Sequence, residues 1–133
     1  MRRLLDTNAY VALKRDQPET KELVRDCERL YISIVVLGEL YFGFHDGTRL
    51  RQNLAQLEEF LEHPLVEVAP LTVTTADRFG RIATQLKRCG TPIPTNDIWI
   101  AAQAMELGVE LISFDQHFEH VPGLVLAFPP RAR

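Results

Sequence analysis

The stretch from Pro94 to Asp115 constrains the fold most, because it joins a helix directly to a strand. Its apolar residues at helical spacing are Ile98, Ala101, Ala102 and Met105. Gly108 is the residue type that ends such a helix, and the apolar run 109–112 then predicts a buried strand. Asp115 follows just past the carboxyl end of this strand, where open α/β sheets bind their ligands.

The start of the same helix carries a second acid. Thr95 and Asn96 are residue types that cap helices, so we expect the helix to begin there and Asp97 to lie in its first turn. The helix dipole favours an acid at this position by roughly 0.3 to 1 kcal/mol. Asp97 alone therefore needs no functional role.

The rest of the chain alternates short apolar runs with helical patterns. Besides 109–112, the predicted strands are 3–5, 30–32, 66–68 and 124–126, and a tail with Pro129 and Pro130 follows the last. The other predicted helices are 9–14, 18–29, 34–44, 50–61 and 72–89, and residues 6–8 are expected to form either a turn or the start of the first of these. Short strands separated by helices predict a parallel sheet covered on both faces. The 133 residues suit one domain, 1–133.

Composition excludes several classes of protein. The net charge of −3 does not give the basic footprint of a general nucleic-acid binder, so phosphate contacts need local basic groups. The candidates are Arg2, Arg3, Lys14, Arg15, Lys87 and Arg88. The sequence shows no signal-peptide core and no membrane span, which predicts a soluble cytoplasmic protein. Cys27 and Cys89 lack metal-site spacing and are expected to be reduced thiols.

Glu39 is the most informative single residue. It lies in the middle of the predicted helix 34–44, which is apolar nearly all round and is therefore expected to be mostly buried. A carboxylate there is costly unless it has a partner. The partner is an arginine, the solvent on a narrow polar strip, or a bound cation, and the helix alone does not choose among them.

Asp6 repeats the pattern of Asp115, because it directly follows the predicted strand 3–5. In a parallel sheet the carboxyl ends of neighbouring strands meet at one edge, so these two acids can converge. This convergence is an inference from topology, and each residue could instead be an ordinary turn acid.

The argument for chemistry rests on four acids together: Asp6, Glu39, Asp97 and Asp115. Converging carboxylates repel, each close pair by about 4 kcal/mol at 4 Å and an effective dielectric near 20. Such a cluster must bind protons or a hard cation such as Mg²⁺ or Mn²⁺. A bound ion can activate water against a phosphodiester. Hydroxyl and amide residues suited to support these acids are Thr7, Asn8, Asn96 and Ser113.

Four motifs carry a family resemblance. They are Leu4 to Asn8, Ser33 with Gly38 to Leu40 and Gly43, Asn96 to Ala102, and Ser113 to Asp115 with Phe118. In order and spacing the chain resembles PIN-domain ribonucleases, more closely the VapC-type toxins of bacterial toxin–antitoxin pairs. One departure is Ser113, where that family often has threonine.

The resemblance implies a three-layer, PIN-like α/β fold with a short five-stranded parallel sheet between helices. It implies that Asp6, Glu39, Asp97 and Asp115 form the catalytic metal site and that RNA is the substrate. It also implies a homodimer neutralised by a cognate antitoxin, with an antitoxin arginine entering the acid cluster. Metal-dependent hydrolysis of RNA is thus the expected activity.

Other enzyme classes find less support. The loop after the first strand resembles that of haloacid-dehalogenase-like phosphatases, but Asn8 stands where those enzymes have a second acid. His45 and Asp46 fall in a predicted turn. His117 and His120 could share a helical face, but with neither glutamate nor cysteine to complete a zinc set they are expected to be surface residues.

A non-enzymatic alternative stays open, namely a regulatory module that binds a partner and whose acid cluster is only structural. The aromatic residues Tyr41, Phe42 and Phe44, with the leucine face of helix 50–61, predict an apolar groove for a partner helix. The two functions are compatible, because a toxin also needs a surface for its antitoxin.

Overall fold

The computed structural model describes residues 1–127, which form a five-stranded parallel sheet in the order β3-β2-β1-β4-β5. The strands are β1 (Arg2–Leu5), β2 (Arg29–Ser33), β3 (Val66–Ala69), β4 (Glu110–Ile112) and β5 (Leu126–Ala127). All five lie at or next to their predicted places, although β5 begins two residues later than expected. The predicted tail at Pro129 and Pro130 lies outside the described residues.

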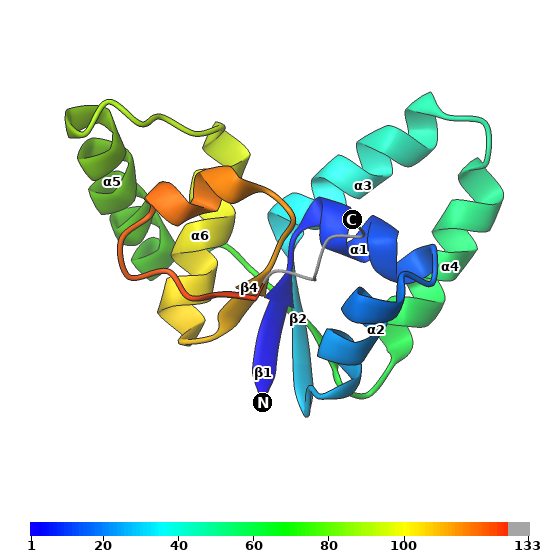
Figure 1. The fold of residues 1–133 in the computed structure, drawn as a ribbon. Helices are drawn as coiled ribbons and strands as arrows, with labels where there is room; N and C mark the ends of the chain where they lie inside the picture. Colours follow the sequence, from blue (N-terminus) through cyan, green and yellow to red (C-terminus); the bar gives the residue numbers. More distant parts are fainter. Residues whose placement is uncertain (128–133) are drawn as a thin grey trace.

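Helices cover both faces of the sheet. They are α1 (Thr7–Lys14), α2 (Pro18–Arg25), α3 (Ile34–Asp46), α4 (Leu50–Glu62), α5 (Val73–Arg88) and α6 (Thr95–Leu107), and a short 3₁₀ helix, η1 (Gln116–His120), follows β4. In Figure 1, α5 and α6 lie on one side of the sheet and α1 to α4 on the other. The expected three-layer α/β fold is therefore confirmed. No helix within residues 1–127 has the length and apolar character needed to cross a membrane.

The core lies where the central strands meet the helices. The side chains of Leu4, Leu5, Ile32, Leu111 and Ile112 are all 0% exposed. Burial on both faces explains why these strands read as continuous apolar runs rather than as an alternation of apolar and polar residues. Each such side chain contributes about 1.5 to 3 kcal/mol of hydrophobic stabilisation.

The central strand β1 places the polar residues that follow it. It pairs in parallel with β2 on one side and with β4 on the other. The strand order therefore changes direction at β1, with β2 and β3 on one side of it and β4 and β5 on the other. The backbone N–H of Asp6 continues the pairing by donating to the carbonyl of Ile112 at 3.2 Å. Asp6 and Asp115 thus follow neighbouring strands at the edge where ligands bind in open α/β sheets.

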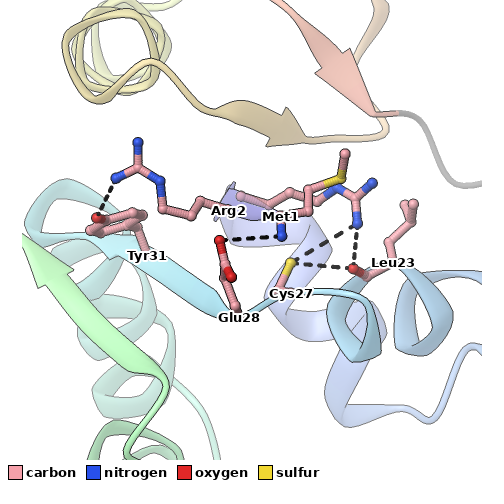
Figure 2. Close-up of polar contacts among 7 residues, drawn as sticks. Met1, Arg2, Leu23, Cys27, Glu28 and Tyr31 are labelled. Carbon is pink, nitrogen blue, oxygen red and sulfur yellow. Dashed lines mark hydrogen bonds and ion pairs between the residues drawn. The ribbon is translucent and has the colours of Figure 1, made fainter.

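Polar contacts fix the amino end of β1, which lies at the other end of the strand from Asp6 (Figure 2). The Met1 amino group lies 3.5 Å from Glu28, and Arg2 donates to the Tyr31 hydroxyl at 3.3 Å. Arg3 is only 7% exposed and forms a 2.9 Å ion pair with Glu110. Arg3 was one of the candidates for phosphate contact, and the burial and pairing of its guanidinium argue against that role.

The structure corrects the predicted end of the second helix. Helix α2 ends at Arg25 instead of residue 29, because β2 already begins at Arg29, which is the register partner of Arg2. Cys27 is buried in the segment that connects α2 to β2.

The composition of helix α3 predicted that it would be mostly buried, and this prediction is wrong. Val36, Leu37 and Leu40 face the core, whereas Phe42 is 71% exposed. The sheet covers only one face of a helix, so an all-round apolar helix leaves its other face uncovered. His45 and Asp46 belong to the last turn of α3 and not to a separate turn.

Candidate active site

A pocket of about 410 Å³ opens at the carboxyl edge of the sheet. Its lining residues are Asp6, Thr7, Asn8, Glu39, Pro94, Thr95, Asn96, Asp97 and Asp115. The structure thus brings the four predicted acids to one place, from the ends of β1 and β4 and from α3 and α6. Of the four predicted supporting residues, Thr7, Asn8 and Asn96 line the pocket, and the buried Ser113 forms a hydrogen bond with Asp6.

Asp6 is the most buried of the four acids, at 3% exposed. It is also the N-cap of α1, and its Oδ1 accepts a 2.8 Å hydrogen bond from the Ala9 N–H. The pKa of Asp6 is raised to about 6, mainly by burial and to a smaller extent by the nearby charges of Asp115 and Asp97. Hydrogen bonds from Ser113 and Ala9 oppose this shift. Asp6 therefore takes up a proton more readily than an ordinary aspartate, and a bound cation would favour its charged form.

Asp97 lies in the first turn of α6, as predicted, but the expected cap is wrong. Pro94 occupies the N-cap position and its carbonyl accepts from the Asp97 N–H at 3.0 Å, without a side-chain cap. Thr95 and Asn96 are consequently free to line the pocket. Burial raises the pKa of Asp97, the charge and hydrogen bond of His117 oppose the shift, and the charges of Glu39 and Asp115 add to it.

His117 is the residue that sequence reasoning missed. Its Nε2 lies 2.7 Å from Oδ2 of Asp97, so the expectation of a surface histidine is wrong at this position. Its partner is 20 residues away in the chain, and no local pattern links the two. The one sequence feature that could have pointed to His117 is its position two residues after Asp115, in the segment that follows a strand end.

Glu39 is half-buried in the middle of α3, and the structure supplies the partner that the sequence left open. The Thr7 hydroxyl donates to Glu39 Oε1 at 2.8 Å. Glu39 therefore reaches the pocket with one oxygen held by a neutral donor from α1, which leaves its negative charge uncompensated by that contact.

Asp115 is the N-cap residue of η1, yet its side chain makes no capping hydrogen bond there and instead lines the pocket. Its backbone N–H donates to the Ser113 hydroxyl oxygen at 3.0 Å, and Ser113 is fully buried. Because the same hydroxyl bonds to Asp6, Ser113 ties the two strand ends together. Asn8 and Asn96 are exposed at the mouth of the pocket.

The chemistry of this donor set fits a hydrated hard cation. The charges of neighbouring acids help to raise the pKa of Asp6 and of Asp97, and the lining residues within 1–127 include neither lysine nor arginine to neutralise them. In the same part of the chain, no three Asp, Glu, His or Cys side chains lie close enough to enclose an ion by themselves. Mg²⁺ keeps several waters and binds through one or two carboxylates, so a complete protein cage is not needed.

Known proteins resemble this chain over nearly its whole length. The chain is 30% identical to the tRNA(fMet)-specific endonuclease VapC of Salmonella typhimurium, over 91% of this chain and 92% of that protein. Its fold superposes with a TM-score of 0.85 on VapBC2 from Rickettsia felis bound to a promoter DNA fragment, at 27% identity, covering 96% and 98% of the two chains.

A third comparison is with VapBC-5 from Mycobacterium tuberculosis, a member of the VapBC family of toxin–antitoxin systems. The TM-score is 0.74 at 25% identity, and 96% of each chain is covered. The family model described as PIN domain matches residues 3–124, which include all four acids and His117. The chain therefore belongs to the PIN-domain family.

Proposed function

We propose that this protein is a Mg²⁺- or Mn²⁺-dependent endoribonuclease that hydrolyses RNA phosphodiester bonds and acts as the toxin of a toxin–antitoxin pair. The observation that carries the proposal is the acid pocket, in which burial and mutual repulsion raise the pKa of Asp6 and Asp97. The relatives named VapC add the substrate class and the biological setting.

Each residue of the pocket has a distinct task in this proposal. Asp6, Glu39, Asp97 and Asp115 would hold the hydrated metal ion, directly through one or two carboxylates and through its bound waters for the others. When bound, the ion supplies Lewis-acid activation of water and neutralises charge that develops on the leaving oxygen. The hydroxyl of Thr7 orients Glu39, and that of Ser113 orients Asp6. Asn8 and Asn96, exposed at the mouth, offer amide groups for hydrogen bonds to the RNA backbone.

The proposed partners are a cognate antitoxin and a second copy of the chain. Solved relatives of the same fold are VapBC complexes, which supports an antitoxin. An arginine from that partner would complement the acid pocket by charge and by bidentate geometry. The exposed apolar side chains on α3, among them Phe42, favour a homodimer. A toxin that acts on cellular RNA would work in the cytoplasm.

The direct test is cleavage of structured RNA by purified protein freed of any copurified partner. We expect cleavage with Mg²⁺ or Mn²⁺ that is lost in Asp6→Asn, a variant that retains the shape and the capping oxygen of Asp6. Thermal melting of both proteins verifies that the variant folds. Equal cleavage by both would indicate a contaminant and would favour the non-catalytic partner-binding module.

A further inference from the structure

His117 and Asp97 reach each other from two different elements. His117 lies on η1 and Asp97 in the first turn of α6, and their closest side-chain atoms are 2.7 Å apart. The exposed fractions are 31% for the His117 side chain and 18% for that of Asp97. The contact is thus partly shielded from water, which makes it stronger than a fully exposed pair.

The imidazole ring of His117 also contacts a core aromatic residue. Its centroid lies 4.9 Å from that of the Phe118 ring, and Phe118 is fully buried in the core. Asp115 is the N-cap residue of the same short helix, so one segment delivers both an acid and this histidine to the site. The His117 ring therefore contacts both the buried Phe118 ring and the Asp97 carboxylate.

The contact also fixes which oxygen of Asp97 is engaged. A carboxylate only accepts hydrogen bonds, so Nε2 carries the proton and donates to Oδ2. Oδ1 of Asp97 takes no part in that hydrogen bond. Asp97 itself lines the acid pocket together with Glu39 and Asp115.

We propose that His117 is a positioning residue of the metal site: by holding Oδ2, it orients Asp97 so that the other oxygen is presented to the ion. This inference rests on the proposed function, because it needs a metal in the pocket. Carboxylate ligands are generally held by outer hydrogen bonds, and loss of such a bond lowers metal affinity by about 10- to 100-fold. His117 supplies this bond without lining the pocket itself.

The test is the Mn²⁺ dissociation constant, measured by calorimetry on the full chain. We expect His117→Leu to raise it by about 10- to 100-fold, because leucine fills space but donates no hydrogen bond. His117→Gln should stay close to wild type, because its amide nitrogen can donate to the same oxygen. His120→Leu is the matched control, since His120 is an exposed histidine on the same short helix.

A second readout separates positioning from a general structural role. The Mn²⁺ concentration for half-maximal RNA cleavage should shift in His117→Leu by the same factor as the dissociation constant. The rate at saturating Mn²⁺ and the melting temperature should remain near those of wild type. A rate that stays low at saturating metal would contradict a role exerted through metal binding.

The remaining outcomes are decisive as well. Equal Mn²⁺ affinity in His117→Leu and wild type would overturn the inference and leave the proposed metal site intact. A His117→Gln variant as weak as His117→Leu would overturn it too, because the hydrogen bond would not be the cause. Wild-type protein that binds no Mn²⁺ would overturn the proposed metal site and the role of His117 together.

Discussion

Thr7 donates a 2.8 Å hydrogen bond from Oγ1 to Oε1 of Glu39, which joins the first turn of α1 to the middle of α3. Thr7 directly follows Asp6, so the strand end that delivers one acid also delivers the residue that holds another. The bond fixes the direction of a half-buried carboxylate on a helix whose neighbouring side chains are apolar. Metal ligation by Glu39 should therefore depend on this hydroxyl.

Thr7→Val tests that dependence, because valine keeps the shape of threonine and removes the donor. We expect RNA cleavage at limiting Mg²⁺ to fall by about 10-fold. The free energy of unfolding should change by only about 1 kcal/mol, the usual value of one such hydrogen bond. Thr7→Ser, which retains the hydroxyl, should cleave like wild type. Unimpaired cleavage by Thr7→Val would show that Glu39 needs no such partner.

The raised pKa of Asp6 predicts an unusual pH dependence of stability. The folded metal-free protein binds this proton more tightly than the unfolded chain, whose aspartate pKa is 3.8. Stability should therefore decrease as pH rises from about 4 through about 6, by roughly 3 kcal/mol in total. Denaturant unfolding in a chelator, repeated from about pH 5 to pH 8, measures this slope.

Asp6→Asn is the control for that slope. The amide keeps the capping oxygen but does not titrate, so the metal-free variant should be more stable than wild type near pH 7 and show a flatter profile. Added Mg²⁺ should stabilise wild type increasingly as pH rises, and Asp6→Asn much less. A metal-free wild type that gains stability on going from pH 5 to pH 7 would contradict the assignment.

Ser113 lowers the pKa of Asp6 through its hydroxyl. Ser113→Ala should therefore move that pKa above its wild-type value, so that Mn²⁺ affinity near pH 6.5 falls more than affinity near pH 8. Titration of the Asp6 carboxyl carbon by NMR measures the pKa directly. Ser113→Thr should restore the wild-type value, because the hydroxyl returns. An Asp6 pKa that is the same in Ser113→Ala and wild type would refute this role.

Arg3 should contribute to stability and not to RNA binding. Arg3→Met removes the ion pair to Glu110 and the 2.7 Å hydrogen bond to the Leu23 carbonyl, at a cost of about 2 kcal/mol in unfolding free energy. The salt dependence of RNA binding should not change. Lys87→Met, on the exposed last turn of α5, is the surface control and should unfold like wild type. A flatter salt dependence in Arg3→Met would place Arg3 at the RNA.

The positions of the four acids were predictable because each is tied to a local pattern. Asp6 and Asp115 follow buried strands, Asp97 lies in a first turn, and Glu39 interrupts an apolar helix. Parallel pairing of β1 with β4 then sufficed to bring two of them together.

The partners of these acids were not predictable, since they depend on tertiary contacts. Thr7 reaches Glu39 across 32 residues and His117 reaches Asp97 across 20. The exposure of Phe42 was missed for a related reason, because periodicity does not show which faces of an apolar helix the rest of the chain covers. The early end of α2 follows from the register of β2 with β1, which local propensity does not contain.

The central claim is that the acid pocket binds a divalent metal ion. The most direct measurement is an anomalous difference map from crystals soaked in Mn²⁺. We predict a peak within the pocket, liganded by oxygens of Asp6 and Asp97 with waters completing the shell, that is absent from Asp6→Asn crystals treated in the same way. A fully soaked wild-type crystal with these carboxylates in place and no anomalous peak between them would contradict the account.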